Sequence, residues 1–166
     1  MNIHSWETLP FNKYLELTTL EQSENELTNG INLVSIINDI PIEEVEKMGI
    51  AEYQKMVSTL EFLQEQPDLD KVKTKWKLKN IDKITMQDFI QFENEKTDTA
   101  NIPSILAMMT NVSENEILSL PTDTVLKGFF LLNKHLNRYI NRSACSLAVR
   151  VNREKLLNKL LFWRKK

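Results

Sequence analysis

The sequence has 166 residues, of which 42% are apolar, so it can bury one hydrophobic core or two small cores that share an interface. Its single cysteine, Cys145, excludes an internal disulfide and with it the class of disulfide-stapled secreted modules. Residues 1–10 do not resemble a signal peptide, and no stretch approaches the roughly 20 apolar residues that span a bilayer. We therefore expect a soluble protein of a reducing compartment, with no membrane partner.

The net charge of -2 conceals a strong segregation of charge along the chain. Residues 1–70 carry a net charge of -11, whereas residues 71–83 carry +5. Residues 84–141 carry -3, and residues 142–166 carry +7. The chain is thus an acidic body with a basic hinge and a basic tail, and this asymmetry bears more on its partners than the total charge does.

Two stretches, 31–60 and 103–132, match each other without a gap at an offset of 72 residues. The matched positions include Glu44, Val45 and Met48 against Glu116, Ile117 and Leu120. Upstream of each copy, a second match at an offset of 75 aligns Leu9, Phe11 and Tyr14 with Ile84, Met86 and Phe89. Such self-similarity indicates an internal duplication, which favours a binding or assembly role.

The first copy is predicted to consist of helices. Thr8 is expected to cap a helix with Pro10 in its first turn, and the polar residues 21–30 are expected to form a loop. Residues 31–39 predict a short central helix, and Pro41 opens a further helical turn. From 51 to 64 the apolar residues follow the spacing of a one-sided helix.

Between the copies, Lys alternates with other residues over 71–79. A period of two is typical of a β-strand, so we predict a short β element at about 71–84, with Trp76 on its buried face. The lysines have two interpretations. They form either a solvated strand edge that discourages pairing with strands of other chains, or a phosphate-binding face beside an aromatic ring. The candidate contact residues are Lys73, Lys75, Trp76 and Lys77.

The second copy repeats the plan of the first. Thr85 is expected to cap one helix, and residues 102–109 form the central one. Ser113, with Glu116 three residues later, predicts a capping box. Asp123 then starts a long amphipathic helix that runs to the end of the copy, near Asn141.

The tail, 142–166, has no counterpart in the repeat and reads as a basic amphipathic helix. Such a helix can fold back onto the acidic body, dock into a groove of a partner, or lie on a membrane. The aromatic pair near the terminus favours an external protein partner. The predicted partner-binding residues are Leu156, Leu157, Leu160, Leu161, Phe162, Trp163, Arg164, Lys165 and Lys166.

No arrangement of residues predicts catalysis, a cofactor or a metal. The three glycines form no phosphate-binding loop, and His4, His135 and Cys145 lack the spacing of metal ligands. Helix starts and solvated faces account for most of the carboxylates. We therefore expect a protein that is not an enzyme; two acids brought together in one cleft would reopen the question.

The repeated block resembles small tail-assembly proteins of bacteriophages. The similarity lies in a short apolar helix, then Glu44-Val45-x-x-Met48 or Glu116-Ile117-x-x-Leu120, then an amphipathic helix. The opening, Trp6-x-x-Leu9-Pro-Phe-x-x-Tyr14, is also similar to the start of such chains. The resemblance implies an all-helical assembly chaperone, or a minor tail, neck or capsid-interior protein. It carries over no functional residues.

These observations combine into one expectation. We predict a mainly α fold with helical repeat A at 1–66, a Lys-rich linker at 67–83, helical repeat B at 84–141 and the basic tail at 142–166. The expected function is bacteriophage assembly or virion structure, through contacts with other phage structural proteins in the host cytoplasm or in the finished particle. The alternative is a protein that binds the packaged genome through residues 71–83 and 142–166.

Overall fold

A computed structural model of the chain describes residues 3, 5–21, 23–74 and 76–140. The basic tail therefore lies outside the described residues. The chain divides into two compact units, Met1–Phe129 and Phe130–Lys166, and the boundary falls within the helix that covers residues 122–140. The predicted division into two repeats, a linker and a tail stays a prediction.

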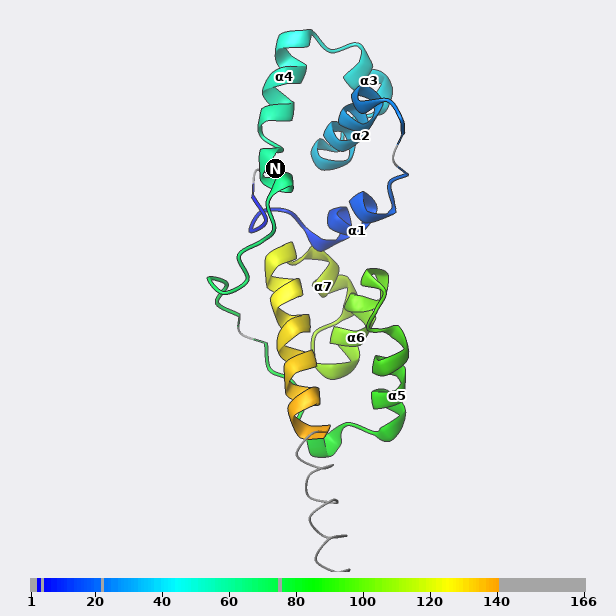
Figure 1. Cartoon of the computed structure of the whole chain (residues 1–166), viewed down its shortest axis with the longest axis vertical. Helices are drawn as coiled ribbons and strands as arrows, with labels where there is room; N and C mark the ends of the chain where they lie inside the picture. Colours follow the sequence, from blue (N-terminus) through cyan, green and yellow to red (C-terminus); the bar gives the residue numbers. More distant parts are fainter. Residues whose placement is uncertain (1–2, 4, 22, 75, 141–166) are drawn as a thin grey trace, which may run out of the picture. The chain divides into compact units, whose positions relative to one another are not determined.

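The fold is mainly helical, as the sequence predicts (Figure 1). The first part of the chain contains α1 (Phe11–Thr19), α2 (Glu26–Asn38), α3 (Ile42–Glu46), α4 (Ile50–Ser58) and the 3-10 helix η1 (Glu61–Gln64). The second part contains η2 (Ile81–Lys83), α5 (Met86–Glu95), η3 (Thr99–Asn101), α6 (Ile102–Met109), α7 (Glu114–Ser119) and the 122–140 helix.

Three helix starts recur along the chain at the repeat offsets, whereas α6 begins 76 residues after α2, at Ile102 and Glu26. Helix α5 begins 75 residues after α1, at Met86 and Phe11. Helix α7 begins 72 residues after α3, and the helix that starts at residue 122 begins 72 residues after α4. These are the two offsets at which the sequence matches itself.

Local sequence explains most of the helix boundaries. The Thr85 side chain accepts a hydrogen bond from the Asp88 backbone N–H, and the Asp88 carboxylate accepts one from the Thr85 N–H, which completes a capping box. These bonds lower the pKa of Asp88, chiefly through the Thr85 backbone N–H. The Ser113 side chain accepts from the Glu116 N–H at the start of α7, so Ser113 caps the helix as predicted, although the structure shows only this half of the predicted capping box.

Three predicted boundaries are wrong. The helix predicted over 51–64 ends at Ser58, where α4 gives way to a turn and the 3-10 helix η1. Thr8 does not cap α1, because its hydroxyl bonds within the preceding turn, to Ser5, and Pro10 takes the cap position. The loop expected over 21–30 is shorter, because Asn25 accepts a hydrogen bond from the Leu27 N–H and starts α2 there. The polar residues after Asn25 are helical because the cap and the apolar face of α2 outweigh their local preference for turns.

The first part of the chain has its own hydrophobic core. It gathers buried side chains from the N-terminal segment, α2, α3 and the end of α4, with Trp6, Tyr14 and Phe62 packed at its edge; the buried members are Ile3, Leu9, Val34, Ile37, Val45 and Leu60. The Trp6 ring makes edge contacts with Tyr14 and Phe62, and its indole N–H donates to the Glu65 carbonyl at 2.9 Å. The aromatic motif of the N-terminus is therefore core.

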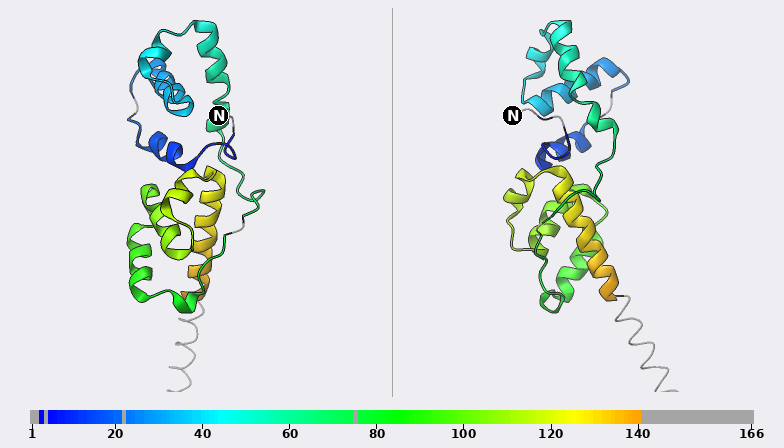
Figure 2. Two further views of the ribbon diagram at one scale, coloured as in Figure 1. Left: turned by 180° about the vertical axis from the view of Figure 1, so that it is seen from behind. Right: turned by 90° about the vertical axis from the view of Figure 1, so that its left-hand side faces the viewer.

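In the second part, α6 is the central element, as predicted. Five of its residues are buried: Ile102, Pro103, Ile105, Leu106 and Met109. Figures 1 and 2 show α6 and α7 beside the first turns of the 122–140 helix, whose Val125 is fully buried. Phe92 of α5 is also fully buried, with its ring 6.5 Å from that of Phe129.

The two parts are joined where residues 9–11 meet residues 120–122. The Phe11 N–H donates to the Leu120 carbonyl at 2.9 Å, and the Thr122 N–H donates to the Leu9 carbonyl at 2.8 Å. These bonds frame an antiparallel bridge between Pro10 and Pro121. The Thr122 hydroxyl donates to the same Leu9 carbonyl at 2.8 Å, so this contact fixes both backbone and side-chain groups.

Candidate interaction surfaces

The basic segment 71–79 does not form the predicted strand. None of the described residues between 71 and 84 belongs to a strand, and 76–80 have no regular structure. A strand requires a neighbouring strand to complete its hydrogen bonds, whereas the Lys79 N–H here donates to the Met109 carbonyl at 2.9 Å, at the end of α6. The Lys79 ammonium donates to the neighbouring Met108 carbonyl, so this lysine caps a helix.

Trp76 attaches the segment to the 122–140 helix. Its indole N–H donates to the Thr124 carbonyl at 3.0 Å, and the side chain is half-buried. An added Cβ at Gly128 would lie 2.6 to 2.9 Å from three atoms of the indole, so the ring lies directly on the glycine. The sequence prediction that Trp76 is on the buried side is therefore right, although the partner is a helix.

The other candidate contact residues of this segment divide into exposed and undescribed ones. Lys73 and Lys77 are exposed, and Lys75 lies outside the described residues. Lys71 is exposed as well, but its ammonium lies 2.8 Å from the Asp68 carboxylate. This ion pair lowers the pKa of Asp68 and raises that of Lys71, and at such exposure it adds little to stability.

A cleft of about 340 Å³ opens beside the basic segment. Residues of both charges, polar residues and apolar residues line it: Trp76, Lys77, Asn111, Val112, Glu116, Leu120 and Thr124. Lys77 and Glu116 carry opposite charges, so the cleft has no single-sign field that would select an anion or a cation. Its mixed lining suits a peptide side chain better than a phosphate.

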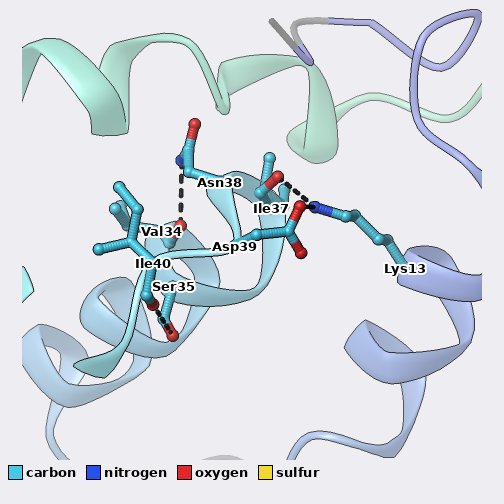
Figure 3. A network of polar contacts seen from close by, with 7 residues as sticks. All are labelled: Lys13, Val34, Ser35, Ile37, Asn38, Asp39 and Ile40. Atoms are coloured by element: carbon cyan, nitrogen blue, oxygen red, sulfur yellow. Dashed lines mark hydrogen bonds and ion pairs between the residues drawn. The ribbon is translucent and has the colours of Figure 1, made fainter. Parts of the chain in front are cut away.

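The end of α2 holds the most buried lysine of the described chain (Figure 3). Lys13 comes from α1 and is only 8% exposed. Its ammonium donates to the Ile37 carbonyl at 2.7 Å and to the Asp39 carboxylate at 2.6 Å. Asp39 adopts the left-handed conformation, with φ of 54°, which ends the helix. The cation therefore sits at the negative end of the α2 dipole.

The second part of the chain has a matching helix end. Met109 stands 72 residues after Ile37, and its carbonyl also receives an N–H from a lysine, Lys79. In each part, then, a lysine from outside the central helix satisfies a carbonyl of its last turn. Sequence analysis missed both roles, because neither lysine is close in sequence to the helix that it caps.

An apolar groove of about 180 Å³ lies in the first part of the chain. Helices α2, α3 and α4 supply its lining: Leu27, Ile31, Val45, Glu46, Met48, Ile50 and Tyr53. Two of these side chains are strongly exposed, Ile50 at 78% and Leu27 at 59%. Sequence analysis assigned Leu27 to a loop and gave Ile50 no role, and their exposure follows only from the folded chain.

Three further findings on the described residues concern metal ligands, buried polar groups and membrane spans. They contain no group of three or more His, Cys, Asp and Glu side chains close enough to hold a metal ion. Every buried side-chain nitrogen or oxygen in that part of the chain has a hydrogen-bond partner. Among the helices that the structure describes, none combines the length and the apolar character needed to cross a bilayer.

The predicted partner-binding residues, 156–157 and 160–166, lie outside the described residues, so they stay a prediction. The structure brings together Trp76 and Lys77 of the secondary set, at the 340 Å³ cleft, and leaves Lys73 apart from its lining. No protein family, no curated protein and no solved structure matches the chain.

Proposed function

We propose that this protein is a non-enzymatic bacteriophage assembly or virion structural protein that acts through contacts with other proteins. The observation that carries the proposal is the recurrence of one helical plan. Helix starts recur at offsets of 75 and 72 residues, the same offsets at which the sequence matches itself. This agreement supports an internal duplication, and tandem copies of a small helical unit are typical of proteins that present repeated binding surfaces.

The resemblance to phage tail-assembly proteins adds the biological setting. Four of its matched positions, Leu9, Phe11, Val45 and Ile117, are buried, whereas Glu44 and Glu116 are exposed. Buried residues of this kind maintain a fold and do not bind ligands, so the resemblance supports a shared helical unit with no carried-over site. We place the protein in the host cytoplasm during assembly, with retention in the particle as the second setting.

The basic tail is the proposed docking element for a phage partner. On a helix, its apolar residues would form one face and its basic residues the other, and residues 1–70 carry a net charge of -11. An amphipathic helix of this type binds by laying its apolar face into a groove, with charge setting its orientation. The partner would therefore present an apolar groove with an acidic border.

Binding of the packaged genome is the alternative, and the exposure of Lys73 and Lys77 favours it. Trp76 weakens it, because the indole N–H is bonded to Thr124 and the ring lies on Gly128, which leaves less of the ring for a base to stack on. The acidic first part of the chain also repels phosphate.

Capture from infected cells tests the proposal. Full-length protein and a chain that ends at Asn141 are immobilised and exposed to lysate from phage-infected host cells, then washed at low and at high salt. We expect the full-length chain to retain a phage structural protein at high salt, and the shortened chain to retain at least about tenfold less.

Nuclease treatment and salt separate the two functions. Neutralising phosphates gives binding that weakens by about 0.9 log units per log unit of salt for each phosphate contacted on duplex DNA, whereas apolar docking is far less sensitive. If the full-length chain retains only nucleic acid, and salt removes it, genome binding replaces the assembly function.

A further inference from the structure

The contact between residues 9–11 and the second part of the chain is the starting point. Leu9 and Phe11 are fully buried, and so is Thr122, to which Leu9 is bonded. Ile117 and Val125, on either side of this contact in the sequence, are also fully buried. We name residues 9–11 the first docking segment and residues 117–125 the closed groove.

The first part of the chain has the equivalent groove, and it is open. Val45, Met48, Ile50 and Tyr53 stand 72 residues before Ile117, Leu120, Thr122 and Val125, the positions of the closed groove. All four line the 180 Å³ groove described above, which we name the open groove. Ile50 is 78% exposed where its counterpart, Thr122, is fully buried. The difference is that none of the described residues covers the first groove in the way that residues 9–11 cover the closed groove.

The second part of the chain has the equivalent segment, in which Ile84 is half-buried but Thr85 and Met86 are exposed. Residues 84–86 stand 75 residues after 9–11, and we name them the second docking segment. Met86, the counterpart of the fully buried Phe11, is 71% exposed. Ile90, one turn further along α5, is exposed as well. Within the part of the chain that the structure describes, one segment and one groove are thus left without a partner.

The second docking segment is held in the second part of its own chain by two sets of contacts. Just before it, the Lys79 N–H is bonded to α6, and Thr85 within it caps α5. No other described residue covers Ile50 or Met86, which are 78% and 71% exposed. The partner that supplies the missing element is therefore best sought in another molecule.

Charge favours the same pairing. Glu46 lines the open groove, and the helices α3 and α4 also carry the exposed acids Glu43, Glu44 and Glu52. The second docking segment follows the exposed cations Lys77 and Lys83, although Asp82 and Asp88 are also nearby. Residues 71–83 carry a net charge of +5 and residues 1–70 one of -11, so two copies attract each other in this orientation.

We propose that the protein associates with a second copy of itself by inserting residues 84–86 of one chain into the open groove of another. The inference rests on the duplication proposed above. Such a contact joins two different surfaces. It produces a closed dimer when each chain contributes both a segment and a groove, and an open chain of molecules otherwise. Burial of Ile50, Met86 and Ile90 supplies the apolar driving force.

Sedimentation velocity on the full-length protein, from about 1 to 100 µM, tests the proposal. The test variants are Ile50→Asp and Met86→Asp. Both residues are exposed at the first position of a helix, where an acid suits the helix dipole, so folding should be preserved and can be confirmed by circular dichroism. Ile42→Glu is the matched control, because Ile42 is an exposed first residue of α3 outside the groove lining.

We expect the unchanged protein and the Ile42→Glu variant to self-associate equally, and each test variant to associate at least about tenfold more weakly. A mixture of the two test variants should regain one-to-one dimers, because one variant retains an intact segment and the other an intact groove. An unchanged protein that stays monomeric, test variants that associate normally, or a mixture that forms no dimer would each overturn the proposal.

These outcomes are independent of the phage partner. If the protein is monomeric but still captures a phage structural protein, the self-association proposal is wrong and the assembly function is supported. If the protein self-associates but captures no phage structural protein, the assembly function is wrong and the role of the open groove in self-association is supported.

Discussion

Replacing Gly128 by alanine is expected to destabilise the protein by about 1–3 kcal/mol, as is typical of overpacking in a well-packed site. The added Cβ would lie 2.6 Å from the Trp76 indole nitrogen and 2.7 and 2.9 Å from two carbons of the ring. The ring cannot simply move aside, because its N–H is bonded to the Thr124 carbonyl at 3.0 Å.

Two effects oppose each other at this position, and steric conflict is the larger. Alanine is favoured over glycine within a helix by roughly 0.5–1 kcal/mol, which offsets part of the loss. Urea unfolding, followed by circular dichroism, measures the net change, and tryptophan fluorescence reports whether the indole environment changes with it.

Gly49→Ala is the matched control. A Cβ at Gly49 meets no atom within 4 Å, and its φ of -64° is accessible to any residue. This variant should lose only about 0.5 kcal/mol, because Gly49 is the N-cap of α4 and alanine caps a helix less well than glycine. Equal stability of the Gly128→Ala and Gly49→Ala variants would mean that Trp76 is not packed on the 122–140 helix.

Replacing Lys13 by methionine is expected to cost about 1–3 kcal/mol, the usual penalty for leaving a buried polar group without its partner. Methionine keeps the length and the apolar stem of the side chain but removes the ammonium that donates to the Ile37 carbonyl at 2.7 Å. It also removes a positive charge from the negative end of α2.

Asp39→Asn separates the two bonds of Lys13. The Asp39 side chain is 80% exposed, so its ion pair with Lys13 is worth at most about 1 kcal/mol. Asparagine also tolerates the left-handed conformation that residue 39 adopts. Urea unfolding should therefore show a much smaller loss for Asp39→Asn than for Lys13→Met. The reverse order would mean that the ion pair, and not the carbonyl cap, holds α1 against α2.

The sequence predicted those parts of the fold that depend on local patterns. The spacing of apolar residues located the central helix α6, and Thr85 and Ser113 marked the starts of α5 and α7 because capping is a short-range interaction. Helix starts at the two repeat offsets follow from the same local patterns.

The sequence did not predict features that depend on distant partners. The alternation of Lys with other residues over 71–79 indicates that one side of the segment is buried. It does not show whether that side packs on a neighbouring strand or on the helix surface at Gly128. Lys13 carries no local mark of its role, because its two acceptors lie 24 and 26 residues away. Ile50 looks like a core residue by its type, and only the folded chain shows it exposed.

The central claim, that this chain acts by binding other phage proteins during assembly, is tested most directly by its distribution in infected cells. Lysates are treated with nuclease and separated on a density gradient, and the protein is followed with an antibody. We expect it to sediment with assembly intermediates or finished particles, and to remain there after nuclease treatment. Recovery only as free protein, or in complexes that nuclease dissolves, would contradict the account.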